Sequence, residues 1–210
     1  TASGLSAQTD YDAFVRADCG GSDQSSYIGP VSFTTPCAPF TATYTENFDG
    51  VSAPDIPSCW STAGNQASEV TTVANSTGTD APPSSPNEVE LDDNFNMIDG
   101  DTALLVSPRF TDLPNHDKRI RFQAAFEDGN FNNHKLYVGV MANQTDASSF
   151  VLLDSAESST DGDYAQFTIN LDNASAIGSN EYIAIAGGSV SSFDELTLDD
   201  FVYEDIPACP

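Results

Sequence analysis

Residues 120–126 read Ile-Arg-Phe-Gln-Ala-Ala-Phe, and this stretch decides the fold class. Apolar side chains occupy every second position, with Arg121 and Gln123 between them. Because successive side chains of a strand point to opposite faces, one face of this stretch is apolar throughout. The stretch therefore predicts a β-strand packed on a hydrophobic core.

Similar short runs recur outward from this stretch, separated by Gly, Asn, Asp, Ser and Pro, while helical periodicity is almost absent. We expect further strands at residues 9–17, 31–35, 102–107, 136–140, 165–171, 182–186 and 196–203. The polar stretch between Gly64 and Asn87 predicts a long surface loop. The predicted fold class is all-β.

Charge excludes several partners. The 210 residues carry 32 acidic and 6 basic side chains, a formal net charge of −26. Nucleic acid is excluded because phosphate recognition needs clustered Lys and Arg, and anionic membranes are disfavoured for the same reason. No apolar run approaches the roughly 20 residues of a membrane span, so we expect no membrane insertion. The acidity predicts a solvated surface, carboxylates that converge on cations, or both together.

The first part of the chain resembles a known family. Residues 9–17 (TDYDAFVRA) and 26–35 (SYIGPVSFTT) resemble the closing strands of a fibronectin type III domain, in the form common in secreted proteins of Bacteroidetes. The resemblance implies that residues 1–37 are the C-terminal part of such a domain. Its early strands are missing, so we expect that residue 1 is not a natural domain boundary.

The rest of the chain resembles a second family. Residues 44–50 (YTENFDG), 56–60 (IPSCW), 104–108 (LLVSP) and 196–202 (LTLDDFV) are similar, in this order, to MAM-like or cleaved-adhesin jelly rolls. The resemblance implies a jelly-roll β-sandwich over residues 38–206, followed by a linker at 207–210. Such domains are non-catalytic modules of secreted peptidases, glycan-degrading enzymes and surface adhesins, but a fold does not fix a function.

The cysteines are Cys19, Cys37, Cys59 and Cys209, without a CxxC motif, which indicates disulfides and an oxidising compartment. Cys19 and Cys37 end successive antiparallel strands, roughly 20 Å apart, whereas a disulfide needs Cα atoms within about 7 Å. We expect a Cys37–Cys59 disulfide, with Cys37–Cys209 as the alternative. Cys19 would then pair outside this chain, and Cys209 with a following domain.

Four carboxylates form the candidate metal site. Glu46 and Asp49 follow the first jelly-roll strand, while Asp199 and Asp200 lie in the last. The resemblance implies that these strands are neighbours and that the four acids mark a buried structural Ca²⁺, which is held by oxygen ligands. Unless a bulge intervenes, only one of Asp199 and Asp200 can point inward. The alternative is that all four are solvated acids or turn formers.

A second acidic cluster, within residues 92–101, resembles an EF-hand only superficially. Met97 stands where that loop needs Gly, and Ala103 where it needs the bidentate Glu. A polar hairpin loop is the prediction.

Two aromatic residues are candidates for ligand binding. Trp60 could stack on a sugar ring or fill the core, and Phe131 lies in a loop where its ring could be exposed.

No catalytic motif is present: the sequence lacks HExxH, GxSxG, a Walker loop and GxGxxG. We therefore expect no catalytic residues. The leading hypothesis is a secreted or surface-bound, calcium-stabilised module for adhesion or glycan binding, with a polysaccharide or glycoprotein as partner. The alternatives are a structural spacer that contacts neighbouring domains of its own protein, or an accessory part of a secreted peptidase or glycoside hydrolase.

Overall fold

The computed structural model describes residues 2–21, 23–74, 81–91, 102–127, 134–158, 162–188 and 195–208. The chain divides into two compact units, Thr1–Ala38 and Pro39–Pro210. Nearly all regular structure is antiparallel β-sheet, which confirms the predicted fold class. Among the described residues, no helix has the length and apolar composition to cross a membrane.

The first unit is a β-hairpin of β1 (Asp10–Val15) and β2 (Ile28–Thr34). On one face, the hydroxyls of Ser32 and Thr34 donate to Asp12 and Asp10. A single hairpin buries little surface, so its apolar side chains stay exposed. These are Leu5, Phe14, Val15, Tyr27, Ile28, Val31 and Phe33. The resemblance of this unit to a fibronectin type III domain stays a prediction.

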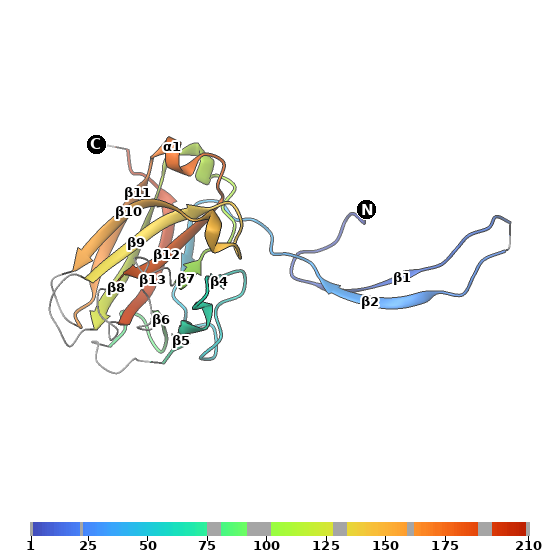
Figure 1. The fold of residues 1–210 in the computed structure, drawn as a ribbon, viewed down its shortest axis with the longest axis horizontal. Coiled ribbons are helices and arrows are strands. Elements are labelled where there is room, and N and C mark those ends of the chain that lie inside the picture. The colour runs from blue at the N-terminus through green and yellow to red at the C-terminus, as the bar shows by residue number, and fades with distance from the viewer. Residues whose placement is uncertain are drawn as a thin grey trace. The chain divides into compact units, whose positions relative to one another are not determined.

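The second unit is a sandwich of two sheets (Figure 1). One sheet has the strand order β10-β9-β12-β7-β4. Its strands are β4 (Ser61–Ala63), β7 (Leu104–Val106), β9 (His134–Met141), β10 (Val151–Ser158) and β12 (Tyr182–Gly188). The other has the order β11-β8-β13-β6-β5, with β3 also paired to β13. Its strands are β3 (Tyr44–Glu46), β5 (Val70–Val73), β6 (Glu88–Leu91), β8 (Lys118–Glu127), β11 (Ala165–Leu171) and β13 (Glu195–Asp205).

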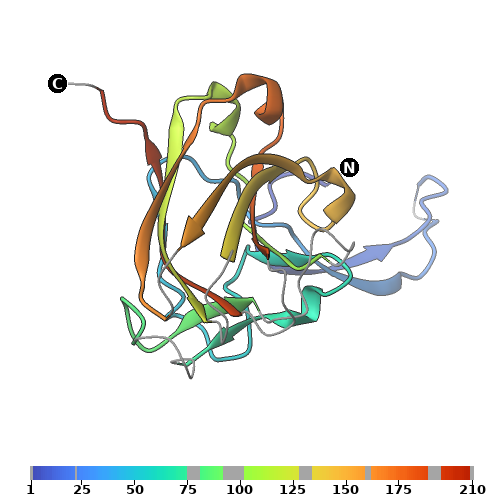
Figure 2. The same cartoon turned by 60° about the vertical axis from the view of Figure 1, so that its left-hand side comes forward.

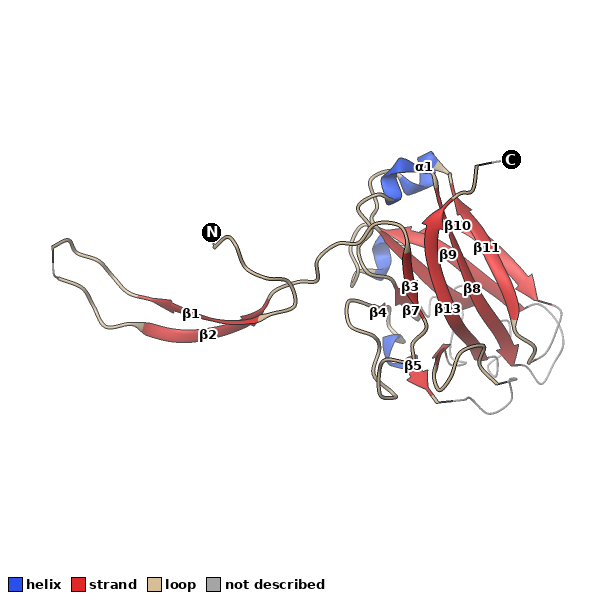
Figure 3. Ribbon diagram, turned by 180° about the vertical axis from the view of Figure 1, so that it is seen from behind, coloured by secondary structure: helices blue, strands red, loops and turns tan. Residues whose placement is uncertain are grey.

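The last strand, β13, organises the second sheet. It pairs with β8 along one side over almost its whole length. Along its other side, Leu196–Leu198 pair with β6 and Phe201–Tyr203 pair with β3. Figure 3 shows β11, β8 and β13 side by side in this sheet. The pairing of β3 with β13 makes the first and last strands of the sandwich neighbours, as the resemblance implied.

Among the described residues, the second unit also contains four short helices. The 3₁₀ helices are η1 (Ala67–Glu69), η2 (Leu113–Asn115) and η3 (Ala147–Ser149), and the α-helix α1 is Ala174–Ile177. Helices α1 and η2 lie next to each other at one end of the sandwich (Figure 2). They cap that end of the core with the buried side chains of Leu113 and Ile177.

The core fills the space between the two sheets. From β8, the alternating side chains of residues 120–126 enter it, as predicted from the sequence. Two aromatic pairs are prominent: the rings of Phe110 and Tyr203 stack at 4.0 Å, and Trp60 meets Phe201 edge-on at 5.0 Å. The largest fully buried side chains are Tyr203, Phe48, Phe110, Phe122, Phe201, Leu91, Leu104, Leu105, Leu113, Ile120, Leu136 and Met141.

Most predicted strands are confirmed, including the fully buried one now seen as β7. The long loop predicted between Gly64 and Asn87 is wrong in part, because η1 and β5 form within it. There, residues 70–73 (VTTV) pair with β6 and bury Val70 and Thr72. Strand β10 was not predicted from the sequence, and its Val151 and Leu152 are exposed.

The cysteines follow the favoured prediction. Cys37 and Cys59 are disulfide-bonded to each other, which confirms that pairing. Cys19 is a free, exposed thiol, consistent with the expectation that it does not pair with Cys37. Cys209 lies outside the described residues.

Thr72 provides a test of the packing. Its hydroxyl oxygen is buried and has no hydrogen-bond partner among the described residues. Burying an unsatisfied hydroxyl is unfavourable, so Thr72→Val should raise the free energy of unfolding by about 1 kcal/mol. Urea denaturation of the full chain measures this. The control is Thr71→Val, a half-buried neighbour, which should change stability by less than about 0.5 kcal/mol. A destabilised Thr72→Val variant would contradict the assignment.

Candidate functional site

A bulge in β13 forms the centre of the candidate site. The pairing of β13 with β8 changes register between Asp199 and Val202. Asp200 takes a left-handed backbone conformation there, with φ 51°. An inserted residue frees neighbouring side chains from strict alternation, so Asp199 and Asp200 need not point to opposite faces. The bulge lies opposite the gap where β3 has ended and β6 has not yet begun.

Asp199 is fully buried at this bulge. Its carboxylate accepts hydrogen bonds from the Ser84 backbone N–H (2.8 Å), from the Ser84 hydroxyl (3.0 Å) and from the Asp200 N–H (2.7 Å). Burial disfavours the charged form more than these bonds favour it, which raises the pKa of Asp199 to about 6. The side chain is therefore a buried acid held by neutral donors.

Asp49 and Glu46 approach the same gap from the other side. Asp49 accepts from the backbone N–H of Asn87 (2.9 Å) and from the side-chain amide of Asn47 (2.7 Å). Glu46 accepts from the backbone N–H of Phe48 (3.0 Å). These bonds close the turn after β3 and attach it to the segment that leads into β6.

The four predicted metal ligands thus all lie around the β13 bulge. The Ser84 hydroxyl connects one of them, Asp199, to the turn after β3, because it also contacts the carbonyl oxygen of Asn47 (3.3 Å). The atoms available as metal ligands here are all oxygens, which are the ligand atoms that Ca²⁺ prefers. Within the described ranges, however, the structure contains no ready-made group of three or more acidic, His or Cys ligands. The carboxylates of Asp199, Asp49 and Glu46 already accept hydrogen bonds from N–H and O–H groups of the protein.

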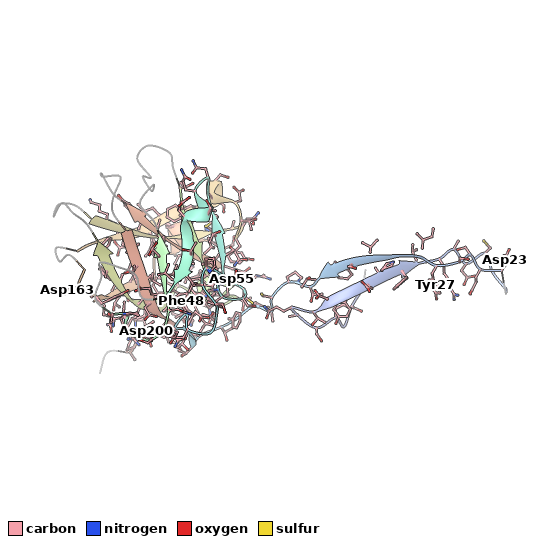
Figure 4. The ribbon with its side chains drawn as sticks, turned by 90° about the horizontal axis from the view of Figure 1, so that it is seen from below. Asp23, Tyr27, Phe48, Asp55, Asp163 and Asp200 are labelled. Atoms are coloured by element: carbon pink, nitrogen blue, oxygen red, sulfur yellow. The ribbon has the colours of Figure 1, made fainter. Side chains whose placement is uncertain are left out.

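Asp200 differs from its neighbours. It is half-buried, and its carboxylate has no hydrogen-bond partner among the described residues. It lies in a cleft of about 570 Å³ on the outer face of the sheet formed by β11, β8, β13 and β3. Figure 4 labels Asp200 at the edge of the second unit. A cleft of this size falls in the range of small-ligand sites.

The cleft has a polar lining. Most of its side chains come from outward-facing positions of the strands, since the alternate positions enter the core. Phe122 and Phe201 reach the cleft only with their backbone, because their side chains are buried. The lining residues are Thr45, Glu46, Asn47, Arg121, Phe122, Gln123, Gln166, Asp200, Phe201 and Val202.

Arg121 is the one cation of this lining, and Glu204 fixes it in place. The Arg121 Nε–H donates to Glu204 at 2.7 Å, and a second guanidinium N–H donates at 3.3 Å. Arg119 shares the same carboxylate, at 2.6 Å. The hydrogen bond from Arg121 is the main cause that lowers the pKa of Glu204. The guanidinium is therefore oriented before any ligand arrives.

Of the two aromatic residues predicted to bind a ligand, the structure describes only Trp60. Trp60 is only 7 % exposed, its ring packs against Phe48 and Phe201, and its Nε1–H donates to the Tyr44 hydroxyl at 2.9 Å. Its ring offers no exposed face for a sugar, which corrects the ligand-binding assignment and supports the core assignment. Phe131 lies outside the described residues, as does the acidic segment 92–101.

Sequence reasoning missed the cleft residues. Arg121 and Gln123 were recognised only as the polar half of an alternating strand, and Gln166 likewise occupies an outward position of β11. Alternation signals that such side chains face outward, but it does not say which strands lie side by side. Ser84 was also missed, because its partner Asp199 is 115 residues away in the sequence.

Solved structures with a similar fold exist. The K1 cleaved adhesin domain of Lys-gingipain from Porphyromonas gingivalis W83 matches with a TM-score of 0.57 and 21% identity, over 79% of this chain and 99% of that domain. The K3 domain matches with a TM-score of 0.53 and 21% identity, over 78% and 100%. The chain shares this fold. The K2 domain of Lys-gingipain matches with a TM-score of 0.56, at 16% identity over 77% and 97%. No family model and no curated protein matches the chain.

The raised pKa of Asp199 predicts a pH dependence in the presence of a chelator. Between pH 4 and 6 the folded state keeps a proton on Asp199 that the unfolded state has lost, so the contribution of this group to stability is greatest below pH 4 and is lost as the pH rises through about 6. The full effect is at most about 3 kcal/mol. Asp199→Asn should remove this slope, as measured by denaturation from pH 4 to 8. Parallel pH profiles for the two proteins would contradict the prediction.

Proposed function

We propose that this chain is a non-catalytic, extracellular module for adhesion or glycan binding, stabilised by calcium. The observation that carries the proposal is the polar cleft on the open face of the β11-β8-β13-β3 sheet. The cleft is wide, pre-formed and lined by hydrogen-bonding side chains, which suits recognition of a polar ligand. The similar structures are adhesin domains of Lys-gingipain, which agrees with this function.

The chemistry of the carboxylates supports a non-catalytic function. Hydrolysis of a glycoside needs a carboxylic acid and a carboxylate that both reach the substrate. Asp199, the acid whose pKa is raised, is buried beneath Ser84 and is not part of the cleft lining. Glu46 lines the cleft, but its carboxylate accepts from Phe48 and Tyr44. Both groups therefore serve the fold.

Two features support an extracellular location. The Cys37–Cys59 disulfide requires an oxidising compartment to form and persist. The formal charge of −26 keeps the chain soluble and away from anionic surfaces. A polysaccharide or a glycoprotein carries the hydroxyls and amides that a polar cleft can bind.

Binding of the full chain to an array of polysaccharides and extracellular-matrix glycoproteins tests the function. We expect retention on at least one polysaccharide or glycoprotein, without release of reducing sugar. The control is the same chain unfolded by reduction of its disulfide and heating. Absence of binding across the array would refute the proposal and favour a structural spacer. Release of sugar from a bound polysaccharide would refute the non-catalytic assignment.

Calcium would contribute stability. The oxygens of Asp49 and Asp199, with those of Ser84 and Asn47, suit this ion and surround a fully buried acid. When bound, the cation would neutralise the buried carboxylate and link β13 to the turn after β3.

Thermal melts at pH 7.5 test the calcium proposal. Adding millimolar Ca²⁺ after chelation should raise the Tm, because the ion binds the folded state. Asp199→Asn and Asp49→Asn should abolish this response. The control is Asp163→Asn, which changes an exposed acid labelled well apart from Asp200 in Figure 4 and should respond as the unmodified chain does. A Tm unaffected by Ca²⁺ would refute calcium stabilisation and leave the binding function standing.

A further inference from the structure

The cleft residues lie in two rows that cross the strands. In one row, Gln166 of β11 pairs with Gln123 of β8; the next partner, Asp199 of β13, is buried beneath Ser84, so the cleft side chains of this row are the two glutamines. Adjacent strands are about 4.8 Å apart, so the face from β11 to β3 is roughly 14 Å wide. This width suits a short chain of rings laid across the strands better than a single small molecule.

The second row supplies the other wall. Arg121 of β8 pairs with Val202 of β13, and Val202 pairs with Thr45 of β3. The two rows are neighbours on the same outward face, because their positions on β8 differ by two residues. Together they form a polar trough with Asp200 at the bulge.

Several of these side chains have unused hydrogen-bonding groups. Among the described residues, the side chains of Gln123, Gln166 and Thr45 make no hydrogen bond within the protein, and the carboxylate of Asp200 is also unpartnered. A primary amide offers both donors and acceptors, and a hydroxyl does the same. A ligand that carries many hydroxyls can therefore satisfy the glutamines on both sides.

The charge of the cleft argues against an anionic ligand. The lining carries two carboxylates, those of Glu46 and Asp200, and one guanidinium, that of Arg121, while Glu204 outside the lining is shared between Arg121 and Arg119. The chain as a whole carries a formal charge of −26. A chain of uronic acids would meet repulsion here, whereas a neutral sugar chain would not.

The cleft also lacks the anchors that a peptide needs. Protein partners usually insert aromatic or aliphatic side chains into apolar pockets. Of the lining residues, Val202 alone presents an apolar side chain on the open face, since Phe122 and Phe201 are buried. The hydrogen-bonding surface is therefore matched to a carbohydrate.

From these observations, and resting on the proposed function, we infer that the cleft binds a neutral oligosaccharide lying across β11, β8, β13 and β3, with Gln123 and Gln166 as hydrogen-bonding residues. Arg121, held by Glu204, donates to the sugar without having to be ordered on binding. The cleft discriminates against oligosaccharides of the same length that carry carboxylates.

A matched pair of probes tests the ligand class: a fully methyl-esterified, neutral oligogalacturonate and the same oligogalacturonate with free carboxylates, beside neutral galacto-, gluco-, xylo- and manno-oligosaccharides. In ¹⁵N NMR titrations of the full chain, at least one neutral probe should shift the side-chain amide signals of Gln123 and Gln166. The oligogalacturonate with free carboxylates should leave them unchanged. Gln123→Ala and Gln166→Ala should each weaken binding about threefold to tenfold, as expected for one neutral hydrogen bond.

The control is Asn170→Ala, which removes an exposed amide from the same strand and outer face as Gln166 but outside the cleft. It should bind as the unmodified chain does, with all variants showing the same Tm. Neutral-sugar binding that survives both glutamine variants would overturn the inference while the proposed function stands. Preference for the oligogalacturonate with free carboxylates, or displacement of the sugar by a gelatin peptide, would overturn the ligand class. Absence of binding to every probe and across the array would remove both proposals.

Discussion

The structure of the second unit depends on one constraint: β13 must pair with β8 on one side and with two separate strands on the other. β3 and β6 cannot both continue along the same edge, so a gap opens between them, and the register shift after Asp199 lies opposite that gap. The turn after β3 and the segment 81–87 fill it. Their backbone N–H groups and the Ser84 hydroxyl then find acceptors on the carboxylates there.

The same constraint links the fold to the cleft. Because the backbone of β13 kinks at the bulge, Asp199 is buried while Asp200 stays at the edge of the trough. After the bulge, from Val202 onward, β13 pairs regularly with β8 and presents a regular outward face. Arg121 is fixed there by Glu204 of β13. One of two neighbouring residues of this strand is therefore part of the buried structure, while the other lines the cleft.

The sequence predicted the parts of this structure that depend on local pattern. The alternation at 120–126 indicated a half-buried strand, and the resemblance of residues 44–50 and 196–202 to jelly rolls implied that the first and last strands meet. It did not predict β5, where a buried Thr72 interrupts the apolar face that Val70 begins, or β10, an edge strand whose exposed Val151 and Leu152 leave it without a clear apolar face. The contact of Ser84 with Asp199 and the row from Gln166 to Gln123 depend on which strands pair, and strand order leaves no mark on local composition.

The alternation along β8 has a consequence for how such a domain can diversify. Ile120, Phe122 and Ala124 hold the sandwich together, while Arg121 and Gln123 between them face solvent. Substitutions of outward-facing residues such as Arg121 and Gln123 leave the hydrophobic packing intact, so the side chains of the outer surface can change one position at a time. A lineage could thus retain a single scaffold through many changes of target, and its members would diverge fastest at the outward positions of the strands.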